Sequence, residues 1–212
     1  MTLEETLKQI RPLNKEAMES AGKRWDSIAK PLHSLGKMED LVIQIAGIQE
    51  TPDISVKKRA LVSMCADNGV VEEGVTQTGQ EVTAIVAENF LSGDTSACVM
   101  CRQCGTDVFP VDVGMVVNTK VPTDLKVAMG TKNMTKEPAM TREEAVKGLE
   151  AGIEMARRLK EKGYTLLATG EMGIGNTTTS SAVASVLLDE PVEKMTGRGA
   201  GLSSEGLNRK IT

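Results

Sequence analysis

The sequence predicts an α/β protein with a three-layer, Rossmann-like parallel sheet and a small helical subdomain at the N-terminus. Two observations lead to this prediction. Short apolar runs alternate with helical patterns of ten or more residues, which is typical of parallel strands joined by crossover helices. The first fifty residues, in contrast, contain only helical patterns. We therefore expect a helical segment over residues 1–50 and an α/β domain over residues 51–212.

Three helices are expected in the N-terminal segment. Thr2 and Glu5 have the spacing of a capping box, and Pro12 ends the helix that begins there. Apolar residues recur with helical spacing over residues 15–28 and 38–48, which predicts two more helices. The last of these helices carries one apolar stripe, formed by Met38, Leu41, Ile45 and Ile48.

Three strands are expected after residue 51. Residues 60–66 are almost all apolar, which is typical of a strand that is buried on both faces. Residues 107–113 predict a second strand with Pro110 at a bend or an edge, and residues 164–169 predict the third. Because the connections between these strands are long enough for crossover helices, the sheet should be parallel. Its ligands should bind at the carboxyl ends of the strands.

Helices between and after the strands follow from the same spacing. One of them begins with a capping box formed by Thr141 and Glu144 and ends at Gly163. Residues 116–139, which are rich in Lys, Thr and Gly, are expected to form an irregular surface excursion. The helices are expected over residues 80–91, 95–104, 141–162 and 203–212.

Composition narrows the classes of function. The 25 basic and 29 acidic residues leave a net charge of −4, which argues against broad binding to nucleic acid or to an anionic membrane. Aromatic residues make up 2% of the chain, too few for base-stacking platforms. No apolar run approaches the ~20 residues needed to span a bilayer, and the acidic N-terminus does not resemble a secretory signal. The sequence therefore predicts a cytoplasmic protein that binds neither nucleic acid nor membranes.

The segment from Thr169 to Ser180 carries the strongest functional signal. Its glycines lie between a buried strand and the start of a helix, where backbone N–H groups can meet an anion. The spacing fits neither a Walker A loop nor the dinucleotide fingerprint. It predicts a phosphate cradle, and a tight turn capped by Asn or Thr is the alternative. Glu171 would repel a phosphate, so it is expected either to accept a hydrogen bond from a sugar hydroxyl or to be an exposed loop acid.

Two other segments suggest ligand contacts. Asp67 follows the first strand and precedes Asn68-Gly69, so it either orients a ribose or a catalytic partner or forms an Asx turn. A second glycine-rich segment, residues 196–203, is followed by a basic residue. Arg198 or Lys210 could therefore neutralise a phosphate.

Cysteine spacing raises a different possibility. Cys98, Cys101 and Cys104 have the spacing of an iron–sulfur run, with Cys65 as a candidate fourth ligand. The run continues a helical pattern, however, and on a helix these three positions cover only about 120° of arc. Buried thiols that act as small hydrophobic groups are the favoured interpretation, and no metal site is predicted. His33 has no neighbouring partner from which a Ser/His/Asp set could be built.

Four segments together resemble those of a known family. They are Ser34–Glu39, Cys65–Val75, Val111–Gly114 and, most specifically, Gly170–Thr178. In order and over essentially all 212 residues, the chain is similar to the nicotinate-nucleotide–dimethylbenzimidazole phosphoribosyltransferase family. The resemblance implies a pentosyltransferase that moves the 5-phosphoribosyl group of nicotinate mononucleotide to 5,6-dimethylbenzimidazole or a related base. The products would be α-ribazole 5′-phosphate and nicotinate, in cobalamin biosynthesis, and the enzyme would be a homodimer without a cofactor.

The resemblance also implies roles for individual residues of this α/β nucleotide-binding domain. Glu171 corresponds to the family's acid near the ribose, and Lys210 corresponds to a basic residue that meets the phosphate. The position of Val86 holds a glutamine in some members, which leaves the identity of the base open. The phosphate turn would contain Gly173, Gly175, Asn176 and Thr177, and the base site would contain Asp67, Thr78 and Val86.

No residue of the chain corresponds to the family's catalytic glutamate. The resemblance places that general base in a C-terminal part of the family that the 212 residues do not match. The chain is therefore expected to hold the mononucleotide-binding half without the base, and to expose a sheet edge and apolar surface. A non-catalytic homologue that binds a nucleotide or a partner is the alternative.

Overall fold

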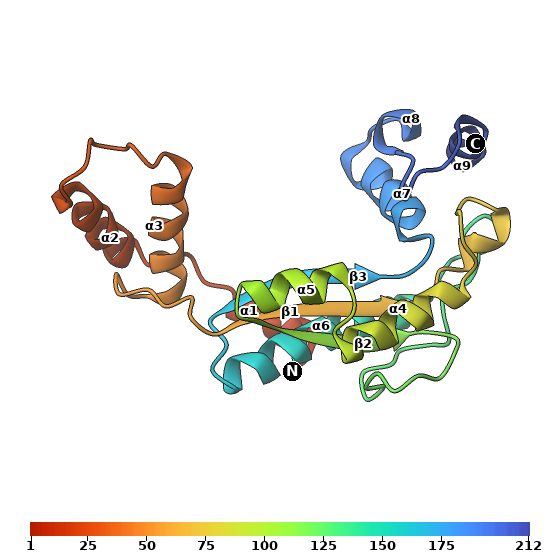
Figure 1. Cartoon of the computed structure of the whole chain (residues 1–212), viewed down its shortest axis with the longest axis horizontal. Helices are drawn as coiled ribbons and strands as arrows, with labels where there is room; N and C mark the ends of the chain where they lie inside the picture. The colour runs from red at the N-terminus through yellow and green to blue at the C-terminus, as the bar shows by residue number, and fades with distance from the viewer. The chain divides into compact units, whose positions relative to one another are not determined.

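The computed structural model describes residues 1–212, which form two compact units (Figure 1). One unit comprises Thr2–Lys58, and the other comprises Arg59–Thr212 together with Met1. The helical unit thus extends past residue 50, where the sequence predicts its end. The difference arises because residues 51–58 continue from the last helix of that unit without joining the sheet.

The helical unit contains the three predicted helices: α1 (Leu3–Gln9), α2 (Lys15–Ser27) and α3 (Lys37–Gln49). The capping box of α1 is confirmed. The backbone N–H of Glu5 donates to Thr2 Oγ1 at 3.2 Å, and the N–H of Thr2 donates to Glu5 Oε2 at 2.9 Å. These bonds satisfy two amides that the first turn of a helix otherwise leaves without partners.

Helices α2 and α3 pack through small residues. Ala17, Ala21 and Ala46 are buried, and a Cβ added at Gly47 would lie 2.7 Å from Met18 Cγ. Such close approach of two backbones requires residues without bulk at the contact. The apolar stripe expected on α3 does not form this contact. Its exposed members are Met38, Leu41 and Ile48.

The α/β unit is built on three parallel strands in the order β2-β1-β3. These are β1 (Arg59–Ala66), β2 (Thr106–Gly114) and β3 (Leu166–Met172). The apolar run of β1 is explained by its central place, since neighbours flank it on both sides. Pro110 lies in the edge strand β2, as its sequence predicts.

The strand β3 extends further than the sequence predicts. Its pairing with β1 continues through Gly170, Glu171 and Met172, where Met172 pairs with Cys65. The expected end at Thr169 is therefore wrong, because ladder hydrogen bonds to the central strand outweigh the turn-forming tendency of glycine. As a result, Glu171 lies on a strand rather than in the loop.

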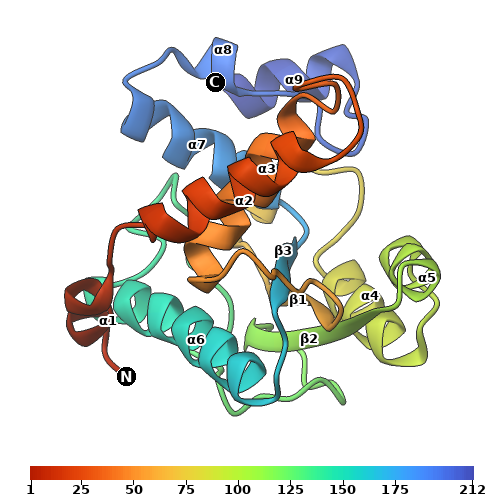
Figure 2. The same cartoon turned by 90° about the vertical axis from the view of Figure 1, so that its left-hand side faces the viewer.

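Helices cover both faces of the sheet, which confirms the three-layer α/β prediction (Figure 2). Helix α6 (Arg142–Glu161) covers one face, and α4 (Glu81–Ser92) covers the other, with α5 (Ser96–Gln103) against β2. The α6 side of the core consists of Ala60, Val62, Val111, Met155 and Leu159. The α4 side consists of Cys65, Ala87, Met115 and Val121.

Several elements follow the carboxyl ends of the strands (Figure 1). They are the 3-10 helix η1 (Gly69–Glu73) after β1 and α7 (Asn176–Leu188) after β3, followed by α8 (Val192–Met195) and α9 (Ser204–Ile211). The short helix α8 has no counterpart in the sequence-based prediction. None of the helices is both long and apolar enough to cross a membrane.

Residues 116–139 contain no helix or strand, as the sequence predicts, but they are bound firmly to the sheet. The N–H of Asp112 donates to the carbonyl of Pro122 at 3.0 Å, and the N–H of Val127 donates to the carbonyl of Val113 at the same distance. Lys126 Nζ lies 3.0 Å from Asp112 Oδ2, whose side chain is fully buried. The segment therefore covers the end of β2.

The edge of the sheet at β3 is open. Leu166 and Leu167 are exposed on this strand, although strands of a parallel sheet are normally covered on both faces. Helix α7 is also unusually apolar on its solvent side. Its exposed members are Val183, Val186, Leu187 and Leu188. This surface confirms the expected open edge and is of the kind that associates with other polypeptides.

Candidate functional site

The candidate site is the turn between β3 and α7, at the carboxyl edge of the sheet (Figure 1). Gly175 occupies the N-cap position of α7 with φ +91°, in the left-handed region that favours glycine. No side chain caps the helix. The N–H groups of Asn176 and Thr178 donate to the carbonyls of Gly173 and Gly175 at 3.0 and 2.9 Å, so the amides of Gly175 and Thr177 are left for a ligand at the positive end of the helix dipole.

Glycine is required at Gly173 by the space around it. A Cβ added there would lie 2.3 Å from the carbonyl oxygen of Ala66 and 2.8 Å from Asn68 Nδ2. Both distances are below any real Cβ contact, and one of the atoms belongs to the backbone, which cannot swing away. The turn thus brings its backbone directly against the end of β1.

Lys210 supplies a positive charge beside this turn. Its side chain reaches from α9 and donates to Thr177 Oγ1 at 2.8 Å and to the carbonyl of Gly197 at 3.1 Å. The residue is only 8% exposed and takes part in no ion pair. Burial lowers the pKa of the Lys210 ammonium. A buried cation without a counter-ion is costly, so the site is prepared for an anion.

Arg198, the other predicted phosphate ligand, is bound to its own loop. Its Nη1 donates to the carbonyl of Leu202 at 2.8 Å, and its Nη2 donates to Ser204 Oγ at 3.0 Å. Gln77 Nε2 donates to the carbonyl of Gly201 at 2.6 Å and joins this loop to the segment after η1. Arg198 therefore stabilises the loop that lines the site, whereas Lys210 provides a positive charge without a counter-ion.

Two hollows meet at the turn. The first, of about 190 Å³, lies between the turn, the loop after η1 and the loop that precedes α9. The second, of about 540 Å³, is lined by Glu171 and by Ser180 of α7. Asn176, Thr177 and Gly199 line both hollows, so one extended ligand can occupy the two together.

Glu171 lies at the border of the second hollow. The residue as a whole is exposed, but its carboxyl group packs against the turn. A Cβ added at Gly173 would lie 2.5 Å from Glu171 Oε1. This burial of the carboxyl group raises the pKa of Glu171 to about 7, while a hydrogen bond from Asn176 Nδ2 acts in the opposite direction. At neutral pH the group therefore both donates and accepts hydrogen bonds, so the repulsion expected between a carboxylate and a phosphate is reduced.

The substitution Glu171→Gln is expected to stabilise the folded chain at alkaline pH. Because the pKa of Glu171 in the folded state is above its ordinary value of 4.5, ionisation disfavours the folded state progressively as the pH rises through about 7. Glutamine keeps the shape and removes the charge. The melting temperature of the variant relative to the original chain should be higher at a pH of about 8 than at a pH of about 5. An equal difference at both values would show that the carboxyl group is not desolvated.

The three residues expected at the base site are not brought together. Thr78 lines the first hollow. Asp67 is 1% exposed and accepts a hydrogen bond from the N–H of Val116 at 2.7 Å, so it holds the end of β2 instead of facing the hollow. Val86 is half-buried on α4 and lines neither hollow. Asp67 and Val86 therefore line neither of the two hollows at the turn, and their part in the base site stays a prediction.

Two buried side chains that no sequence motif marks as functional contact the turn. Thr83 Oγ1 accepts a hydrogen bond from the N–H of Ile174 at 3.0 Å, and Asn68 Nδ2 donates to the carbonyl of Ile174 at 3.1 Å. The only sequence signal was the polar Asn68-Gly69 pair at the end of a strand. Thr83 gives no local signal, because it lies inside an otherwise ordinary helix.

The cysteines do not form a cluster. Cys98 is buried, and its thiol bonds to the carbonyl of Phe90, while Cys101 is half-buried and Cys104 is exposed on or just after α5. Nowhere in the chain do three His, Cys, Asp or Glu side chains come together in a way that could hold a metal ion. His33 is exposed in the helical unit.

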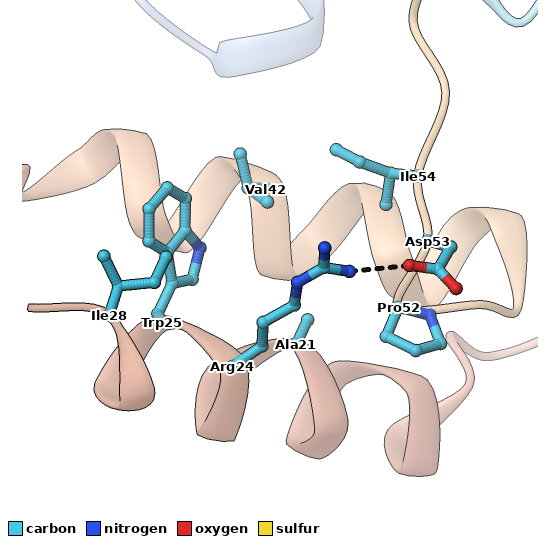
Figure 3. Close-up of a pocket in the computed structure, with 8 residues that line it drawn as sticks. All are labelled: Ala21, Arg24, Trp25, Ile28, Val42, Pro52, Asp53 and Ile54. Atoms are coloured by element: carbon cyan, nitrogen blue, oxygen red, sulfur yellow. Dashed lines mark hydrogen bonds and ion pairs between the residues drawn. The ribbon is translucent and has the colours of Figure 1, made fainter.

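A separate hollow of about 260 Å³ lies in the helical unit between α2 and α3 (Figure 3). Arg24 Nη1 and Asp53 Oδ1 form an exposed ion pair across it at 2.6 Å. Its other lining groups are apolar or small, so it lacks the anion-binding groups found at the turn. Those lining residues are Ala21, Trp25, Ile28, Val42, Pro52 and Ile54.

Comparison with known proteins identifies the family. A family model described as phosphoribosyltransferase matches residues 10–212. The chain belongs to this phosphoribosyltransferase family.

Curated relatives and solved structures agree with this assignment. The chain is 51% identical over 213 residues to the nicotinate-nucleotide–dimethylbenzimidazole phosphoribosyltransferase of Ruminiclostridium cellulolyticum, with 100% of this chain and 60% of the relative covered. It is 48% identical to the enzyme of the same name from Clostridium tetani, with 98% and 58% covered. The crystal structure of CobT from Thermus thermophilus matches 92% of this chain and 60% of its own, with a TM-score of 0.86 and 40% identity.

The chain thus spans about 60% of the length of the phosphoribosyltransferases it matches. The turn between β3 and α7, Lys210 and the hollows all lie within the matched residues. The resemblance first seen in the glycine-rich segment is therefore confirmed at the level of family and fold.

Proposed function

We propose that the protein takes part in the transfer of the 5-phosphoribosyl group of nicotinate mononucleotide to 5,6-dimethylbenzimidazole or a related base. The observation that supports this proposal is the uncapped glycine turn at the start of α7, together with the buried, unpaired ammonium of Lys210. Both features suit a phosphate monoester. Membership of the phosphoribosyltransferase family narrows the ligand to a phosphorylated ribose.

In this proposal the phosphate lies between the turn and Lys210. The ammonium already donates to Thr177 Oγ1, which leaves the proton of that hydroxyl available to the ligand. Amides of Gly173, Gly175 and Thr177 would add further donors. Together these groups would replace the water that a phosphate loses on binding.

The ribose would lie against Glu171 and Asn176, whose side chains are bonded to one another. With a pKa of about 7, Glu171 can accept from or donate to a ribose hydroxyl. The incoming base would lie in the hollow beside Thr78, where Met172 and Leu202 provide apolar surface. Which benzimidazole-type base is preferred depends on this small set of contacts.

The chemical step needs a proton acceptor. One azole nitrogen forms a bond to C1′ of the ribose as the bond from C1′ to the nicotinate nitrogen breaks, and the other azole nitrogen loses its proton. A positioned carboxylate typically contributes a factor of about 10²–10⁴ to such a step. The resemblance assigns this role to a glutamate outside the 212 residues. We propose that the matched region binds the mononucleotide and that the remaining 40% of the family's length supplies the base.

A complementation assay tests this proposal. The chain would be incubated with nicotinate mononucleotide and 5,6-dimethylbenzimidazole, with and without a separate polypeptide that carries the unmatched part of the Ruminiclostridium cellulolyticum relative. We expect release of nicotinate and formation of α-ribazole 5′-phosphate only when both polypeptides are present. Product from the 212 residues alone would place the base within them, with Glu171 as the first candidate.

A non-catalytic nucleotide-binding role is the second candidate, favoured by the absence of any assignable base within the matched region. It predicts binding of nicotinate mononucleotide and no product even after complementation. The homodimer implied by the resemblance and the cytoplasmic location predicted from the sequence are also proposals. Light scattering on the purified protein would test the dimer, and the exposed apolar face of α7 favours association on physical grounds.

A further inference from the structure

Asn68 and Thr83 contact the residue at the centre of the turn from two different elements. Asn68 follows β1, and Thr83 lies in the first turn of α4. Their bonds to the carbonyl and the N–H of Ile174 measure 3.1 and 3.0 Å. Thr83 is fully buried and Asn68 is 8% exposed, so water competes little for the groups in either hydrogen bond.

The two bonds fix two successive peptide groups. The N–H of Ile174 belongs to the peptide that joins it to Gly173, and the carbonyl of Ile174 belongs to the peptide that joins it to Gly175. All peptide bonds of the chain are trans. In a trans peptide the C=O and N–H groups point in opposite directions. Because Asn68 binds the carbonyl of Ile174, the N–H of Gly175 must point away from Asn68.

Close packing adds to this restraint. A Cβ at Gly175 would lie 3.3 Å from Asn68 Cβ, which shows how closely the turn rests on this side chain. Thr179 Oγ1 lies 3.3 Å from Asn68 Oδ1, which connects Asn68 to the first turns of α7 as well. The amide of Asn68 thus joins the end of β1, the glycine turn and the following helix.

We propose that Asn68 and Thr83 are positioning residues that aim the N–H of Gly175 at the phosphate. Neither side chain lines the hollows, so their effect on the ligand is exerted through Ile174. This inference rests on the proposed function, since it assumes that the turn holds the phosphate of nicotinate mononucleotide. The inference assigns the geometry of the turn to two residues that are distant from it in sequence.

The test compares Thr83→Val with Thr83→Ser. Valine has nearly the shape of threonine but cannot accept the hydrogen bond from Ile174, whereas serine keeps the hydroxyl. The affinity for nicotinate mononucleotide should fall about 10-fold in Thr83→Val, which corresponds to the loss of one aimed hydrogen bond, and stay nearly unchanged in Thr83→Ser. Asn68→Asp, which keeps the acceptor Oδ1 but loses the donor Nδ2, should weaken binding similarly.

Backbone NMR of the same variants separates the possible outcomes. The amide signals of Ile174 and Gly175 should shift in Thr83→Val and Asn68→Asp before any ligand is added, and return towards their original positions in Thr83→Ser. If the original chain binds no mononucleotide, the proposed function fails. If it binds and both Thr83→Val and Asn68→Asp bind equally well, the positioning role is wrong. Loss of binding in Thr83→Ser as well would indicate a packing role instead.

Discussion

The substitution Gly173→Ala is expected to abolish measurable binding of nicotinate mononucleotide. The new Cβ would have to fit 2.3 Å from the carbonyl oxygen of Ala66 and 2.5 Å from Glu171 Oε1. Since the Ala66 carbonyl belongs to the end of the central strand, the glycine turn must move instead. A displacement of about 1 Å in the turn removes the alignment of several phosphate donors at once, so a loss of more than about 100-fold is expected.

Gly170→Ala is the matched control, because it adds the same methyl group three residues earlier, within β3. A Cβ at Gly170 would meet Leu61 Cδ1 and the carbonyl of Val62 at 3.5 Å, which are ordinary contacts. Titration calorimetry should therefore find nearly unchanged affinity for Gly170→Ala. Equal affinity in Gly173→Ala and the original chain would show that the turn does not bind the phosphate.

The substitution Lys210→Met is expected to have the second largest effect. Methionine fills the buried space of the lysine stem but removes the positive charge, which has no counter-ion in the chain. Loss of a charge-assisted contact to phosphate is expected to weaken the binding of nicotinate mononucleotide by about 10–100-fold. Binding of the corresponding nucleoside, which lacks the phosphate, should hardly change.

The stability of the Lys210→Met variant is not expected to fall together with its affinity for nicotinate mononucleotide. Burial lowers the pKa of Lys210, which means that the folded chain resists holding the ammonium. The melting temperature of Lys210→Met should therefore not fall below that of the original chain near neutral pH. Arg209→Met is the control, because the neighbouring Arg209 is exposed and its Nε donates to the carbonyl of Gly74 at 3.2 Å instead of contacting the glycine turn. A similar loss of affinity in both variants would indicate a general effect of surface charge.

Local sequence patterns predicted most of the fold. The capping boxes at Thr2 and Thr141 are present, and all three strands form a parallel sheet in which the most apolar run is central. These features depend on neighbours a few residues apart, which a single sequence displays. The end of β3 is not visible in the local sequence, because it is set by pairing with β1, a partner about a hundred residues away.

Only the contiguous part of the candidate site can be predicted from the sequence. The glycine turn is visible in the sequence because every residue of it is contiguous. Asn68 and Thr83 contact Ile174 across separations of 106 and 91 residues, and nothing local marks Thr83 as different from other helical threonines. Asp67, in contrast, looks functional in sequence, and the structure uses it to hold the backbone of Val116.

The most direct test of the phosphate site is an NMR titration of the ¹⁵N-labelled chain with nicotinate mononucleotide and, separately, with its nucleoside. We expect the amide signals of Gly173, Gly175 and Thr177 to shift with the mononucleotide and to remain in place with the nucleoside. Unchanged signals at saturating mononucleotide, or equal shifts with both ligands, would contradict the assignment of this turn as the phosphate site.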